Sequence, residues 1–171
     1  MLRDVERVIN SQREHIGEEV VTDWVTLDQR AVDVFSSLTG DYALQHNDPS
    51  WAREVGRFGG RTIVHGLFGV SLVPHFLRQV PDSVVLPSDE VNILNYGIDS
   101  LRFVSPMFVG VPIRGRLTLV EVKEKAEGRY LLDYLVALEQ EGSERPCMIA
   151  HSLLMVLLDG TGLDSSGKRS T

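Results

Sequence analysis

The sequence predicts an α+β domain in which an antiparallel sheet wraps around one buried helix. Residues 62–79 place apolar side chains around most of the circumference of a helix, and such a helix in a globular protein is buried. Residues 91–157 then form long strand-like runs separated by short turns, which implies antiparallel pairing. A buried helix followed by several such strands is an α+β arrangement.

The bulk properties describe one domain without a nucleic-acid or membrane partner. We assign residues 1–160 of the 171-residue chain to a single domain and the small, polar residues 161–171 to a C-terminal tail. A net charge of −7 argues against nucleic-acid binding. No window approaches the roughly 20 apolar residues of a membrane-spanning helix. The single cysteine, Cys147, excludes an intrachain disulfide and fits a reducing cytosol, so we expect a cytoplasmic protein.

The first third of the chain predicts two helices with a strand between them. Residues 2–14 have the apolar spacing of a short amphipathic helix, and residues 19–26 have the β-branched and aromatic character of a strand. A second helix follows, for which Thr26 and Gln29 are a plausible capping box. Gly40 ends it, because glycine is best suited to a helix C-terminal turn.

The next segment is rich in turn signals and leads into the apolar helix. We expect little long regular structure from residue 41 to 60, with one helical turn at 50–53 after Asn47-Asp48-Pro49. Thr62 is the candidate N-cap of the helix at 62–79. Pro74 lies inside that helix and should kink it or mark its last straight turn.

Four strands are predicted in the second half of the chain. Residues 91–104 and 111–122 are the first two, and the second alternates, with Ile113, Leu117 and Leu119 on one face. Residues 129–140 form its partner after a turn. Residues 146–157 are apolar on both faces, as expected of a central strand. Cys147 lies in this run, which favours a buried, inert thiol over a nucleophile.

Asp41 and His46 are the candidate chemical groups. A carboxylate and a histidine fixed around one water can activate that water and return a proton to a substrate. The N-terminus of the helix near Thr62 offers unpaired backbone N–H groups for a developing oxyanion. His65 is either a second acid–base group or, as we prefer, a buried structural histidine. Ser71 either bonds back to a helix carbonyl or orients Asp41.

Other chemistries lack their motifs. The chain has no HxxxH, no HExxH and no cysteine pair, so we expect no metal site. It has no GxSxG elbow for a serine nucleophile, no GxGxxG after a strand and no GxxxxGK[ST]. We therefore expect no nucleotide, metal or other cofactor.

The ordered motifs resemble those of the MaoC-like (R)-specific enoyl-CoA hydratases. The hydratase signature is matched by Thr39-Gly40-Asp41, His46, Asp48-Pro49, Ile63-Val64-His65-Gly66 and Ser71. The nodulation-protein-N-like branch is closer still, through the segments 23–26, 58–60, 71–75, 95–97, 101–106 and 114–116. The resemblance spans about residues 15–157.

This resemblance implies a hot-dog fold, an antiparallel sheet wrapped around a long central helix, usually in a dimer. It implies syn addition of water to a trans-2-enoyl thioester to give an (R)-3-hydroxyacyl thioester, or the reverse dehydration. By position, Asp41 and His46 are the catalytic dyad. Ser71 and the backbone of Ile63, Val64, His65 and Gly66 bind the substrate, an acyl-CoA or acyl-carrier-protein thioester.

Two rival functions remain open, and one departure from the family pattern keeps the second of them open. The family commonly has Asn-Pro two and three residues after the aspartate, where this chain has Ala43-Leu44. The first rival is a hot-dog thioesterase, which directs water at the carbonyl. The second is a non-catalytic acyl-thioester-binding subunit.

Overall fold

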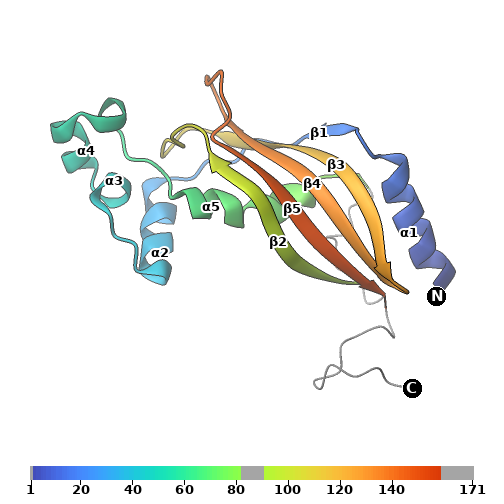
Figure 1. Cartoon of the computed structure of the whole chain (residues 1–171). Coiled ribbons are helices and arrows are strands. Elements are labelled where there is room, and N and C mark those ends of the chain that lie inside the picture. The colour runs from blue at the N-terminus through green and yellow to red at the C-terminus, as the bar shows by residue number, and fades with distance from the viewer. Residues whose placement is uncertain (1, 82–90, 159–171) are drawn as a thin grey trace.

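The computed structural model describes residues 2–81 and 91–158, which form a curved antiparallel sheet with helices against its concave side and beyond one end (Figure 1). The elements, in chain order, are α1 Leu2–Glu14, β1 Glu19–Val21, α2 Gln29–Thr39, α3 Leu44–Asn47, α4 Pro49–Val55, the 3-10 turn η1 Arg57–Gly60, α5 Gly66–Ser71, α6 Val73–Leu77, β2 Val91–Phe103, β3 Ile113–Ala126, β4 Arg129–Gln140 and β5 Met148–Leu158. The predicted α+β class is confirmed. The predicted tail, 161–171, lies outside the described residues.

The sheet has five strands in the order β1-β3-β4-β5-β2. Every neighbouring pair is antiparallel, and the register aligns Leu117 with Val136 and Val136 with Ala150 across three strands. These side chains are buried on the concave face, and the alternation predicted for 111–122 is confirmed. β5 lies between β4 and β2, as expected of a central strand.

The core lies between the concave face of the sheet and the short helices α5 and α6. Phe76, on α6, is fully buried and packs against Gly115 of β3. A methyl group on Gly115 would lie 3.1 Å from Phe76, so the absence of a side chain there lets the helix approach the sheet. α1 lies at the opposite end of the sheet from α2–α4 (Figure 1).

The prediction of one helix over 62–79 is wrong at its start and in its continuity. Residues 62–65 are extended because Val64 N–H donates to the Met107 carbonyl at 2.7 Å and Ile63 forms a β-bridge with Phe108. The helix therefore begins at Gly66 rather than Thr62. It breaks after Ser71, and α6 restarts with Pro74 in its first turn, in agreement with the predicted kink. Leu67 is exposed, so the helix is not buried all round.

Two other boundaries differ from the predictions. Asp28, not Thr26, caps α2, because its carboxylate accepts a hydrogen bond from Ala31 N–H at 2.8 Å. The strand predicted at 19–26 shortens to β1, and Val25 adds only an isolated bridge to Ile113. Gly40 ends α2 in the left-handed conformation (φ 75°), as predicted.

Helices α2, α3 and α4 form a separate helical group beyond one end of the sheet (Figure 1). Short turns connect them, and Asp48 caps α4 by accepting from Ser50 N–H and Trp51 N–H. Within the described residues, no helix is long and apolar enough to cross a membrane. This helical group supplies most of the side chains of the candidate site.

Candidate functional site

The candidate site lies where the helical group meets the extended segment 62–65. Asp41 follows directly after Gly40, and His46 lies on α3. Two reciprocal bonds join α3 to the segment, since Ile63 N–H donates to the Gln45 carbonyl at 3.0 Å and His46 Nδ1 lies 2.7 Å from the Ile63 carbonyl. These bonds place the His46 ring against the residues just before α5.

His46 is held in a single neutral tautomer. A carbonyl oxygen only accepts, so His46 Nδ1 carries the hydrogen that it donates to Ile63. In the neutral ring, His46 Nε2 is the unprotonated nitrogen, and it lies 3.3 Å from the Gln45 side-chain amide nitrogen. Burial, the main cause, and the neighbouring His65 ring lower the pKa of His46, while the Ile63 carbonyl and Asp41 oppose this. His46 is therefore a neutral proton acceptor near pH 7.

Asp41 presents a half-exposed carboxylate to the same place. Its Oδ1 accepts from the Ala43 N–H at 3.3 Å, and its Oδ2 lies 3.9 Å from His65 Nε2. One ligand-capable atom each from Asp41, His46 and His65 lies within 4.8 Å of the others. The fold thus brings together three titratable groups that lie up to 24 residues apart in the sequence.

His65 is buried behind the Asp41 and His46 pair. Its Nε2 lies 3.1 Å from the Asp41 carbonyl and 3.2 Å from Ser36 Oγ. Its ring stacks on His46 with centroids 3.8 Å apart and contacts Phe35 on α2. His65 Nδ1 is buried and has no hydrogen-bond partner among the described residues. The preferred prediction of a buried histidine bonded to a backbone carbonyl agrees with this geometry.

Three polar residues on one face of α2 hold the site, and the sequence reasoning missed them. Gln29 Nε2 donates to the His46 carbonyl at 2.7 Å, and Gln29 Oε1 accepts from Thr62 Oγ1 at 2.8 Å. Asp33 binds Gln29 and Asn47, while Ser36 Oγ donates to Asn47 Oδ1. The signal was the spacing i, i+4, i+7 of Gln29, Asp33 and Ser36, which puts them on one side of a helix.

The predicted substrate-binding residues divide into two groups. Ile63, Val64 and His65 form the extended approach to α5, and Gly66 is its first residue. Gly66 is covered by the Phe103 ring, since a methyl group there would lie 2.6 Å from that ring. Ser71 is exposed at the end of α5 and donates to the Phe68 carbonyl at 2.7 Å. That bond is the first of the two alternatives considered for Ser71.

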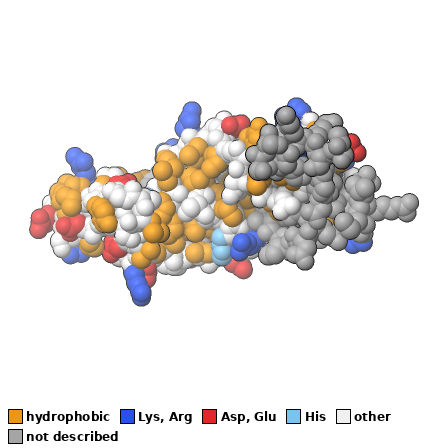
Figure 2. Space-filling model, turned by 90° about the horizontal axis from the view of Figure 1, so that it is seen from below, with side chains coloured by type: hydrophobic (Ala, Val, Ile, Leu, Met, Phe, Trp, Pro, Cys, Tyr) orange, Lys and Arg blue, Asp and Glu red, His pale blue; other side chains and the backbone are white. Residues whose placement is uncertain are grey.

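Exposed apolar side chains lie on the helices and loops that carry the site. Figure 2 shows hydrophobic side chains spread over much of the face seen from below. Those exposed on α2 to α5 include Val34, Leu38, Tyr42, Leu44 and Leu67. Such a concentration is typical of a surface that contacts a ligand or another chain.

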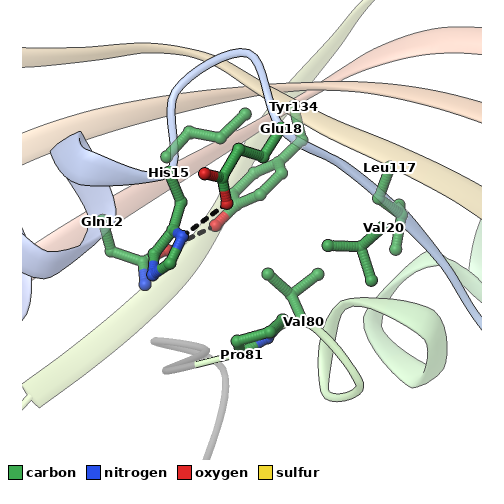
Figure 3. A pocket seen from close by; sticks show the side chains of 9 residues that line it. Gln12, His15, Glu18, Val20, Val80, Pro81, Leu117 and Tyr134 are labelled. Carbon is green, nitrogen blue, oxygen red and sulfur yellow. Dashed lines mark hydrogen bonds and ion pairs between the residues drawn. The ribbon is translucent and has the colours of Figure 1, made fainter.

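A small hollow lies elsewhere, between α1, β1 and the sheet (Figure 3). Tyr134 donates its hydroxyl to Gln12 Oε1 at 2.7 Å, and His15 pairs with Glu18 at 2.7 Å. None of the residues predicted to be catalytic or substrate-binding lines it. The cluster at Asp41 and His46 therefore remains the candidate site.

Known proteins resemble the chain over most of its length. The family described as MaoC like domain matches residues 11–139. Nodulation protein N of Rhizobium leguminosarum bv. viciae is 32% identical over 145 residues, covering 84% of this chain and 88% of that protein. The 3-hydroxyacyl-thioester dehydratase Z of Mycobacterium tuberculosis is 34% identical over 139 residues, covering 81% and 88%.

The solved structures agree on the architecture. The (R)-hydratase from A. caviae superimposes with a TM-score of 0.60 at 23% identity, covering 81% of this chain and 94% of that one. This likeness establishes the hot-dog fold that the motifs implied.

Proposed function

We propose that this chain, which belongs to the MaoC-like dehydratase family, is an (R)-specific enoyl-CoA hydratase or 3-hydroxyacyl-thioester dehydratase. The observation that carries the proposal is the position of His46, a buried imidazole that donates from Nδ1 to the Ile63 carbonyl and has a ring nitrogen within 4.8 Å of an Asp41 carboxylate oxygen. A hydro-lyase needs such a pair, one group to take a proton from water and one to orient that water.

The proposed reaction proceeds on one face of the substrate. Asp41 accepts a hydrogen bond from the water, and His46 Nε2 removes its other proton. The oxygen forms a bond to C3 of the trans-2-enoyl thioester, and the π electrons move to the thioester oxygen. His46 Nε2–H then returns the proton to C2, which gives the (R)-3-hydroxyacyl thioester. Dehydration is the same sequence in reverse.

The substrate is proposed to lie across the start of α5. The first N–H groups of a helix have no partner within it, so the backbone at Gly66 suits the enolate oxygen. The backbone of Ile63, Val64 and His65 leads to that point, and Ser71, the last residue of α5, is proposed to contact the acyl chain. The mechanism uses only protein groups, with no metal or other cofactor.

The proposed working form is a cytoplasmic homodimer acting on a CoA or acyl-carrier-protein thioester. β2 ends the sheet and pairs only with β5 among the described strands, and it exposes Leu94, Tyr96 and Ile98. A sheet edge that exposes apolar side chains among the described residues favours pairing with a second chain. Contact with the second chain would also bury the exposed apolar residues of α2 to α5.

The direct test is hydration of crotonyl-CoA and longer enoyl-CoAs, followed by loss of the enoyl absorbance. Asp41→Ala and His46→Ala should each lower kcat by about 10²–10⁴-fold, the usual contribution of a positioned acid or base. His75→Ala, which changes an exposed histidine on α6, is the matched control and should retain activity.

Three outcomes contradict the proposal in different ways. Full activity in both variants would show that Asp41 and His46 are not the catalytic pair. Release of free thiol without hydration would favour the thioesterase. Tight acyl-CoA binding by wild-type protein without turnover would favour a non-catalytic binding subunit. The replacement of the family's Asn-Pro by Ala43-Leu44 is the sequence feature that supports this alternative.

A further inference from the structure

We propose that His65 is a positioning residue whose Nε2–H and ring face together hold Asp41 and His46 in their reactive arrangement. This inference rests on the proposed function, in which Asp41 and His46 handle the water. The three residues come from the loop after α2, from α3 and from the extended segment before α5. His65 is the one that contacts both of the others.

The first contact is a hydrogen bond to the backbone of Asp41. The Asp41 carbonyl, 3.1 Å from His65 Nε2, only accepts, so Nε2 carries a hydrogen. Ser36 Oγ, 3.2 Å away, gives its own hydrogen to Asn47 and therefore accepts from the same Nε2–H. The bond ties the loop that carries the Asp41 carboxylate to the segment 62–65.

The second contact is the stacked pair of imidazole rings. The rings of His46 and His65 are 3.8 Å apart at 25°, and Phe35 packs against His65 with centroids 5.1 Å apart. His65 is only 3% exposed, so its ring has little freedom to move. His46 is thus fixed at Nδ1 by the Ile63 carbonyl and across its face by His65.

The two nitrogens of His65 are unequal, and this makes the role testable. Nε2 makes both hydrogen bonds, whereas Nδ1 has no partner among the described residues. Glutamine can place an amide N–H near the position of Nε2. Asparagine is shorter and reaches only the region of Nδ1. A role that depends on Nε2–H should survive the first substitution and fail in the second.

The experiment compares His65→Gln with His65→Asn in the full-length protein. We expect His65→Gln to lose less than about tenfold in kcat and His65→Asn to lose about 10²-fold, since a small misplacement of reacting groups costs that much. KM should change less than kcat in both variants, because the substrate contacts proposed for His65 are made by its backbone.

An NMR titration of the His46 ring gives a readout that does not require turnover. His65 faces His46 and contributes to lowering its pKa, as burial does, while Asp41 acts in the opposite direction. Replacing His65 by either amide should therefore raise the pKa of His46. An unchanged titration in both variants would show that the His65 ring does not act on His46.

The outcomes separate this inference from the proposed function. Equal kcat losses in the two variants, or an unchanged His46 titration, would overturn the role of His65. If wild-type protein hydrates no enoyl thioester, the proposed function fails, and the titration alone decides whether His65 holds His46. If His65→Asn does not fold by circular dichroism, His65→Met replaces it as the variant without a donor, with the same expectation.

Discussion

Gln29 carries three hydrogen bonds with one side chain, and Gln29→Leu should remove all of them. Its amide donates to the His46 carbonyl at 2.7 Å and to Asp33 at 3.0 Å. It also accepts from the buried Thr62 hydroxyl at 2.8 Å. A hydrogen bond contributes about 1 kcal/mol net to stability, so the free energy of unfolding should fall by about 3 kcal/mol.

Urea unfolding followed by circular dichroism measures this loss. With an m-value of about 2 kcal/mol per M, the midpoint should fall by about 1.5 M. Gln79→Leu is the matched control, because Gln79 accepts one bond, from Asp23 N–H at 2.8 Å, at a site away from the cluster. Its midpoint should fall by about 0.5 M. Equal shifts at the same protein concentration would refute the assignment of three bonds to Gln29.

Three further predictions concern Gly115, Cys147 and His46. Gly115→Ala should lower the free energy of unfolding by about 1–3 kcal/mol because its methyl group would meet Phe76 at 3.1 Å, and a thermal midpoint at or above that of wild type would contradict this. Cys147 is 2% exposed and burial raises its pKa, so the native thiol should react far more slowly with a thiol reagent than the urea-unfolded chain, and equal rates would exclude a buried thiol. Burial lowers the pKa of His46 in the folded state. The free energy of unfolding should therefore fall as the pH drops below about 6.5, the pKa in the unfolded chain. The fall is at most about 1.4 kcal/mol per pH unit and ends at the folded pKa. His46→Gln should weaken that dependence, and identical urea midpoints from pH 7.5 to 5.5 in wild-type protein would contradict it.

The sheet was predictable because its signal is local. Turn signals between β-forming runs identified 129–140 with the same bounds as β4, and the other long strands within a few residues. The segment 62–65 was not predictable in this way. Ile63 and Val64 fit a helix or a strand equally well, and the extended form is selected by Met107 and Phe108, more than 40 residues away.

The candidate site was only partly predictable for a related reason. Asp41 and His46 were indicated by residue type and by the family resemblance, and the fold does bring them together with His65. The tautomer of His46 depends on the Ile63 carbonyl, and the orientation of His65 on Ser36. Those partners come from other elements, so no spacing within one segment reveals them.

The break between α5 and α6 divides the central helix into parts of unequal local stability. α6 buries Val73, Phe76 and Leu77, whereas α5 buries Gly69 and exposes Leu67. Segments with fewer buried contacts open locally at a lower free energy, so the backbone amides of α5 should exchange with solvent sooner than those of α6. The part of the central helix that starts beside His65 should therefore open locally while α6 stays packed against Gly115.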